Sequence, residues 1–160
     1  MNVLTKQLKV HFDLAWEMLL QLIEICPDNL WKKKLGGFVF WQQILHVLSG
    51  IKFWTRQENT YFEEPFADRE VYPEMDREPK GTVSKAEMLE LVSELTAQVN
   101  LFFSNNDLWL GENNVIYEKI LNIDVIQMQT RHLQYHVGFC DGCLRERKKP
   151  ATEWHDYFGE

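Results

Sequence analysis

Residues 36–54 read GGFVFWQQILHVLSGIKFW, the most apolar stretch of the 160-residue chain. Apolar side chains recur at helical spacing over roughly 38–54, so we predict a helix there, introduced by the two glycines. Two glutamines, a histidine and a lysine interrupt the apolar run, and a bilayer would penalise these groups heavily. The stretch therefore indicates a buried helix of a soluble protein.

Three further segments have helical features. Apolar residues recur at intervals of three and four over 3–25. Ser84-Lys-Ala-Glu87 is a capping box that predicts the start of a third helix, which Asn105-Asn106 close. Asp124 is expected to cap a fourth helix that runs to about Arg147.

The segment 55–83 breaks the helical pattern. It holds three prolines, eight acidic residues and four basic residues. A connection of this length is unusual in a compact domain and suggests either a functional loop or a crossover. Four aromatic residues are expected to pack it onto the helices: Tyr61, Phe62, Phe66 and Tyr72.

These features together predict an all-α protein, a four-helix bundle with a long crossover between helices 2 and 3. No strand pattern is convincing, although residues 107–123 are expected to form a connector with a short strand or turn. The aromatic tail at 151–160 is expected to dock on the bundle. The length is most simply that of one domain over 1–160.

Composition limits the classes of partner. The formal net charge of -7 argues against nucleic acid held through its phosphates and against a polybasic membrane surface. No signal pattern follows Met1, so nothing points to secretion. The three cysteines fit free thiols in a reducing cytoplasm better than a disulfide framework.

His132 and His136 are four residues apart on the predicted fourth helix, so both rings project from one face. A metal ion can bridge such a pair at ligand distances of about 2.0–2.1 Å. Two ordinary histidines on a helix surface would show the same spacing. Leu133 stands where the zinc-protease motif requires glutamate, so peptidase activity of that type is excluded.

His46 lies among apolar residues in the middle of the second predicted helix. Burial of its ring without a partner would cost about 1–3 kcal/mol, so His46 must meet a polar group or an ion. It is either a core histidine bonded to an oxygen or a ligand that faces the histidines of the fourth helix, since bundles build metal sites from inward side chains.

A histidine on the second helix, a long crossover and the run H-x-x-Y-H-x-G at 132–138 resemble the DinB/YfiT-like superfamily. The order of helices and connections resembles that of the family over nearly the whole chain. The sequence motif itself matches only at His46, Leu48 and 132–138. The resemblance implies a four-helix bundle, often a homodimer, in which His46, His132 and His136 bind one divalent metal ion. After Gly138 the chain departs from the usual polar run of the family.

The resemblance further implies a metal-dependent thiol S-transferase with zinc or nickel and a low-molecular-weight thiol cosubstrate. Three imidazoles would leave an open position on the ion, as in catalytic zinc sites. A metal-binding bundle without turnover, acting in a stress response or on a partner, is the alternative. Tyr135 and Gln42 or Gln43 are candidates to orient the ligands, and no acidic residue flanks the histidines to act as a general base.

Cys140 and Cys143 share a helical stripe with His132 but lie about 12 and 16 Å further along the axis, at about 1.5 Å per residue. One ion cannot bind both histidines and either cysteine on a straight helix. Cys140 is expected to be a small buried residue, or else to line the pocket. A redox role is disfavoured because the pair falls in the last turns, where the helix dipole opposes a thiolate.

Overall fold

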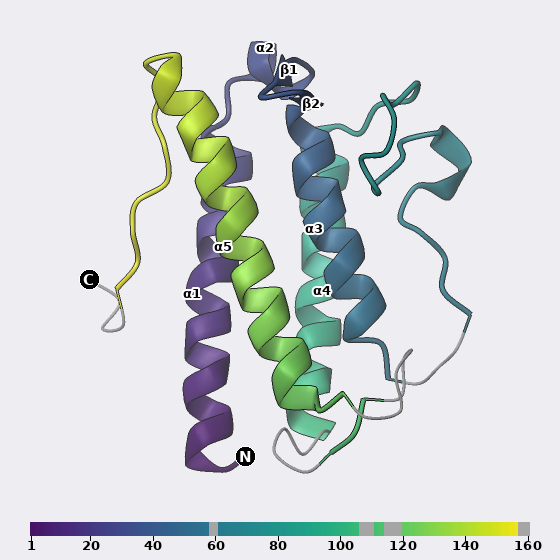
Figure 1. Ribbon diagram of the computed structural model, residues 1–160, viewed down its shortest axis with the longest axis vertical. Coiled ribbons are helices and arrows are strands. Elements are labelled where there is room, and N and C mark those ends of the chain that lie inside the picture. Colours follow the sequence, from purple (N-terminus) through teal and green to yellow (C-terminus); the bar gives the residue numbers. More distant parts are fainter. Residues whose placement is uncertain (58–60, 106–110, 114–119, 157–160) are drawn as a thin grey trace.

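The computed structural model describes residues 1–57, 61–105, 111–113 and 120–156. Helices account for most of these residues, so the predicted all-α class is confirmed. The four long helices are α1 (Val3–Ile25), α3 (Phe40–Trp54), α4 (Lys85–Asn105) and α5 (Asn122–Glu146). α1 and α3 each pack against both α4 and α5, and their apolar faces enclose a hydrophobic core between them (Figure 1).

The start of α5 differs from the prediction. Asp124 does not cap this helix, because the helix begins at Asn122 and Leu121 takes the capping position. The Asp124 carboxylate instead accepts a hydrogen bond from the Leu121 backbone N–H at 3.2 Å. An acidic side chain in this third position satisfies a backbone donor and favours the positive end of the helix dipole.

A hairpin precedes α3, and the prediction of no strand was wrong there. β1 (Lys34–Leu35) pairs antiparallel with β2 (Phe38–Val39). Gly36 and Gly37 form the turn with φ values of 60° and 99°, a geometry that favours glycine at both positions. Strands of two residues are too short to show an alternating pattern, and the four-residue helix α2 (Asp28–Trp31) was missed for a similar reason.

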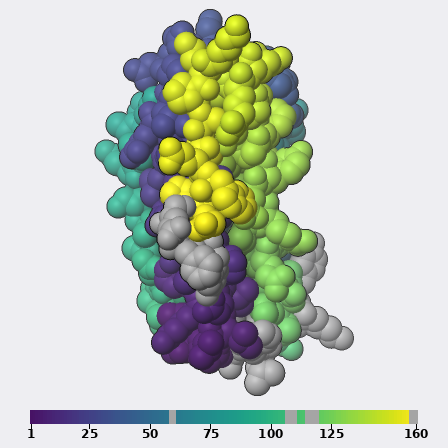
Figure 2. Space-filling model, turned by 90° about the vertical axis from the view of Figure 1, so that its left-hand side faces the viewer, coloured from purple at the N-terminus to yellow at the C-terminus, as the bar shows by residue number. Residues whose placement is uncertain are grey.

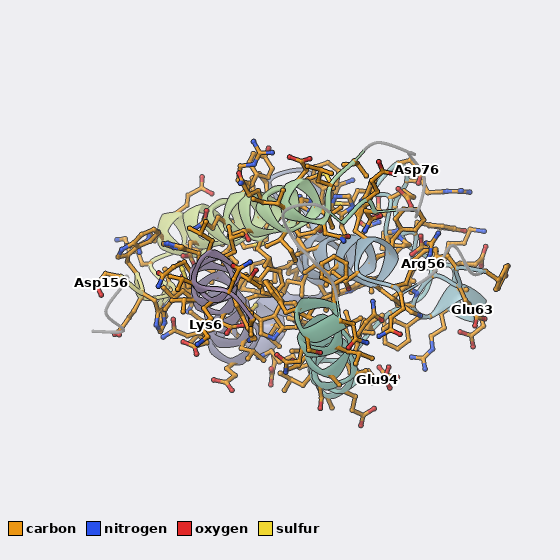
Figure 3. The ribbon with its side chains drawn as sticks, turned by 90° about the horizontal axis from the view of Figure 1, so that it is seen from below. Lys6, Arg56, Glu63, Asp76, Glu94 and Asp156 are labelled. Atoms are coloured by element: carbon orange, nitrogen blue, oxygen red, sulfur yellow. The ribbon has the colours of Figure 1, made fainter. Side chains whose placement is uncertain are left out.

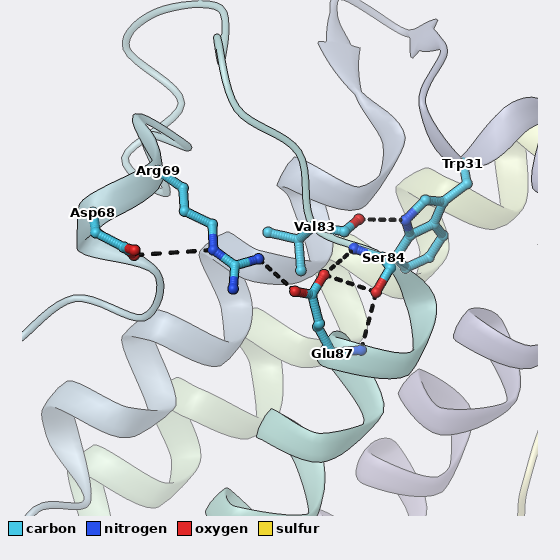
Figure 4. Close-up of polar contacts among 6 residues, drawn as sticks. All are labelled: Trp31, Asp68, Arg69, Val83, Ser84 and Glu87. Carbon is cyan, nitrogen blue, oxygen red and sulfur yellow. Dashed lines mark hydrogen bonds and ion pairs between the residues drawn. The ribbon is translucent and has the colours of Figure 1, made fainter.

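The predicted capping box at the start of α4 is confirmed (Figure 4). Glu87 accepts hydrogen bonds from the Ser84 backbone N–H and hydroxyl at 2.8 and 2.7 Å, and Ser84 Oγ accepts one from the Glu87 backbone N–H at 3.2 Å. The Arg69 guanidinium pairs with the other oxygen of Glu87. The hydrogen bond from Arg69, followed by those from Ser84, lowers the pKa of Glu87 to about 2.

We expect the stabilising effect of Glu87 to disappear in acid. Because its pKa is lower in the folded chain than in the unfolded chain, its contribution is present above pH 4.5 and is lost as the pH falls toward 2. The urea midpoint of Glu87→Gln should lie below that of the wild type at pH 7, and the difference should shrink below pH 4.5. Glu90→Gln, which changes an exposed acid one turn later, should show no such pH-dependent difference.

The segment between α3 and α4 lies along α3 (Figure 1). The Gln42 amide donates to the carbonyls of Tyr72 and Arg77 at 2.8 and 3.0 Å, and Lys52 Nζ donates to the Glu63 carbonyl at 2.9 Å. These contacts fix the segment at both ends of the helix. Packing of its aromatic residues was predicted correctly for Phe62, Phe66 and Tyr72, which are half-buried, but not for Tyr61, which is 91% exposed.

The described part of the tail docks as predicted, running over the helices on the face shown in Figure 2. Its anchor is Asp141 of α5, which accepts hydrogen bonds from the Thr152 N–H at 3.0 Å and from the Thr152 hydroxyl at 2.5 Å. In the view from below, Asp156 lies on the opposite side of the helices from Glu63 and Asp76 of the α3–α4 segment (Figure 3).

Of the predicted connector at 107–123, most lies outside the described residues. Its described parts meet in an isolated antiparallel bridge between Glu112 and Leu121, where a short strand or turn was expected. No described helix is both long enough and apolar enough to cross a bilayer.

Candidate metal centre

The three predicted histidines meet between α3 and α5. One ring nitrogen each of His46, His132 and His136 can be chosen such that all three lie within 4.8 Å of one another. The ring centroids are 4.8 to 4.9 Å apart in every pair. The chain thus brings together three imidazoles from helices almost ninety residues apart in sequence, and such a cluster could hold a metal ion.

Two of the three rings are oriented by carbonyl oxygens. His46 Nδ1 lies 2.8 Å from the Pro73 backbone oxygen, and His136 Nδ1 lies 2.6 Å from Gln43 Oε1. A carbonyl oxygen only accepts hydrogen bonds, so both Nδ1 atoms carry the proton and both Nε2 atoms keep a lone pair. Donation of the second ring N–H to a carbonyl is the usual arrangement of histidines that bind metals.

His132 is placed by a different feature. Its ring lies against Gly50, where an added Cβ would be 3.4 Å from His132 Cε1 and 3.5 Å from Nδ1. Gly50 is one turn after His46 on α3. A methyl group at this position would make only ordinary van der Waals contact with the ring, so the His132 ring packs directly against this small residue of α3.

The cluster favours neutral imidazoles. Burial, followed by the neighbouring His46, lowers the pKa of His132 to about 4. Burial, His132 and His46, in that order, lower the pKa of His136 to about 3. Only neutral imidazole coordinates a metal, so His132 and His136 are in the ligating form at neutral pH.

The donor set fits a divalent ion of the zinc or nickel type, since imidazole nitrogen suits both. Two nitrogen ligands of a tetrahedral ion lie about 3.4 Å apart when each bond is about 2.0–2.1 Å. The three nitrogens, which lie within 4.8 Å, need to approach one another by at most about 1.4 Å to reach that geometry. A set of three protein ligands would leave one position of a tetrahedral ion open.

A pocket of about 760 Å³ opens beside the cluster. His46 and His132 line it, together with groups from α3, α5 and the α3–α4 segment. The apolar lining consists of Phe53, Trp54, Phe62, Pro73 and Met128, with the exposed Tyr135 beside them. The polar lining consists of Ser49, Glu64, Glu74, Gln129 and Arg131.

The sequence analysis did not identify two acidic residues that line the pocket, because no acidic residue is adjacent to the histidines in the sequence. Glu64 accepts a hydrogen bond from the Ser49 hydroxyl, and Ser49 is three residues after His46 on α3. Glu74 directly follows Pro73, whose carbonyl holds His46. The acidic excess of segment 55–83 was the available signal, but it did not show which acids face the site.

Of the residues proposed to orient the ligands, Gln43 does so directly, whereas Gln42 holds the α3–α4 segment. The Tyr135 ring lies edge-on to His136, with centroids 5.0 Å apart, and its side chain is largely exposed. The segment 55–83 borders the pocket. The described part of the tail does not, because Trp154 and His155 lie with His11 near α1.

The cysteines do not join the histidine cluster. Cys140 is 1% exposed, as predicted for a small buried residue, and burial raises the pKa of its thiol above the ordinary range. Burial also raises the pKa of Cys143, and all three cysteines are free. α5 continues through both positions to Glu146, so the helix keeps these thiols at a distance from the histidines.

Comparison of the chain with models of known families, with curated proteins and with solved structures finds no match.

Proposed function

We propose that this chain is a DinB-like four-helix bundle, a single domain over 1–160 with a long crossover between α3 and α4, which binds one divalent metal ion through His46, His132 and His136. The observation that carries the proposal is the meeting of three imidazole nitrogens within 4.8 Å. The carbonyl oxygens that orient His46 and His136 support the proposal. They hold the proton on Nδ1 of each ring, so the Nε2 lone pairs are available for an ion, and packing alone does not require this arrangement.

We further propose a metal-dependent thiol S-transferase. A divalent ion in this cluster would lower the pKa of a thiol or of a water molecule that binds it. The chain itself supplies the rest of the site: Gln43 and Pro73 fix two rings, and the pocket beside His46 and His132 has room for a small molecule. Its apolar walls would exclude water from the reacting groups.

Cobalt substitution tests the thiol reaction. Adding a low-molecular-weight thiol to the Co²⁺-loaded protein should produce the intense charge-transfer absorption of a cobalt–sulfur bond, both in the wild type and in a Cys140→Ser, Cys143→Ser variant. A band that is present before any thiol is added and is lost in the variant would show that a protein cysteine reaches the ion. That result would contradict the geometry of α5.

A metal-binding bundle without turnover is the second candidate. The cobalt experiment separates the two, since a protein that only stores or senses the ion has no need of an open position that accepts thiols. The three buried free thiols are compatible with a cytoplasmic location for either candidate.

We also propose a homodimer, on the resemblance and on exposed apolar residues of the helices. Large aromatic residues of the core, including Phe12, Trp31 and Trp41, are buried within the chain and do not contribute to such a surface. Val3, Leu4 and Leu101 are 73, 53 and 46% exposed and remain available for a helix-face contact. Sedimentation at micromolar concentration should give twice the mass of the chain; a strict monomer would exclude this proposal.

A further inference from the structure

The pocket beside the histidines carries two acids with no basic partner. Within the described residues, Asp68, Glu70, Asp76 and Glu78 of the α3–α4 segment each have a basic side chain within 4.0 Å. Glu64 and Glu74 have no such partner in the part of the chain that the structure describes, and both line the pocket. Glu63 also has no basic partner among the described residues, but it does not line the pocket, whereas the half-buried Glu64 and the exposed Glu74 do.

The two acids line the same pocket and repel each other. Burial raises the pKa of Glu64, and the neighbouring Glu74 carboxyl raises it further, against the opposing effects of Ser49 and Lys52. Lys52 does not line the pocket, and its ammonium group donates to the Glu63 carbonyl. A cation that entered the pocket would relieve the repulsion between two carboxylates that form no ion pair with a described side chain.

A third group in the pocket is an acceptor without a donor. Gln129 is 2% exposed, and its Oε1 atom has no hydrogen-bond partner among the described residues. A buried amide oxygen in this state costs free energy unless something donates to it. The oxygen itself is shielded from solvent, but Gln129 lines the pocket, so rotation of its amide would let a ligand supply that hydrogen bond.

The remaining walls suit an apolar body. Phe53 and Phe62 meet edge to face with ring centroids 5.0 Å apart, and Trp54 and Met128 extend this apolar surface. Apart from the histidines, Arg131 is the one basic residue among the described lining residues, and it is exposed on α5. The inner polar groups are the half-buried Glu64 and the buried Ser49 and Gln129.

We propose that the pocket binds an organic amine: an aromatic or otherwise apolar body lies against Phe53, Trp54 and Phe62, the ammonium group pairs with Glu64 and Glu74, and a second N–H or O–H group donates to Gln129. This deepens the proposed function by giving the class of molecule that would reach the metal centre. The amine proposal rests on the proposed function only where it assigns a role to the metal, because the acids and the apolar walls would bind an amine without an ion.

Binding of three molecules with one indole body tests the inference: tryptamine, its alcohol tryptophol and the anion indole-3-propionate. Calorimetry on the metal-loaded and the metal-free protein should rank tryptamine first. Glu64→Gln should weaken tryptamine binding about tenfold or more, since it removes a charge-assisted hydrogen bond. The matched control Glu63→Gln, an exposed acid next in sequence, should leave the affinity unchanged.

Gln129 is tested separately. Gln129→Leu should weaken tryptamine binding several-fold but leave 2-(1-naphthyl)ethylamine unaffected, because that amine has no ring N–H to donate. Equal binding of the three indoles would overturn the proposal. A preference for the anion would also overturn it and would indicate that Arg131 is the charged group that binds the ligand. Binding of a second metal ion that is lost in Glu64→Gln would also overturn it, by making the acids ligands. Loss of metal binding with amine binding retained would refute only the metal proposal.

Discussion

Each of the variants His46→Ala, His132→Ala and His136→Ala should lose nearly all bound metal, with affinity reduced at least a hundredfold. The three nitrogens lie within 4.8 Å, so a divalent ion would be held by all three at once, and two remaining imidazoles form a poor site. The measurement is metal content of protein purified without a histidine tag, followed by competition with a chelator.

Cys140→Ser and Cys143→Ser are the controls, and both should keep about one ion per chain. His155→Ala is a further control, because this half-buried ring lies near Glu17 of α1 at 3.7 Å and takes no part in the cluster. If His46→Ala kept full occupancy while Cys143→Ser lost it, the ligand set proposed above would be wrong.

Gln43→Leu should weaken metal binding by about 10- to 100-fold while leaving all three ligands in place. Gln43 is 3% exposed, and its Oε1 is the acceptor for His136 Nδ1 at 2.6 Å. Leucine has nearly the same volume but accepts no hydrogen bond, so His136 would lose the contact that fixes its ring and its tautomer. The expected result is a larger dissociation constant with an unchanged stoichiometry.

Gln43→Glu provides the matched test, since a carboxylate restores the acceptor. It should recover most of the affinity that Gln43→Leu loses. Circular dichroism and thermal unfolding of the metal-free variants would show whether the core tolerates each change. An equal loss in Gln43→Leu and Gln43→Glu, at unchanged stability, would mean that Gln43 acts by packing and does not orient His136.

Local patterns in the sequence were enough to locate the four long helices. The apolar spacing of 3–25 and the capping box at Ser84 predicted α1 and the start of α4, because both signals act within a few residues. The i, i+4 spacing put His132 and His136 on one face of α5. The two-residue strands around Gly36 and Gly37 were missed, since they are shorter than any period that a pattern can show.

The site itself depends on contacts between distant segments. The sequence could nominate His46 because a polar ring in an apolar helix needs a partner, but the packing of α3 on α5 decided that this partner was a pair of histidines. The orienting oxygens of Gln43 and Pro73, the approach of His132 to Gly50, and the facing of Glu64 and Glu74 into the pocket appear only in the tertiary structure. Helical periodicity fixes which residues share a face within one helix, whereas the direction in which a long irregular segment turns its side chains is set by what it packs against.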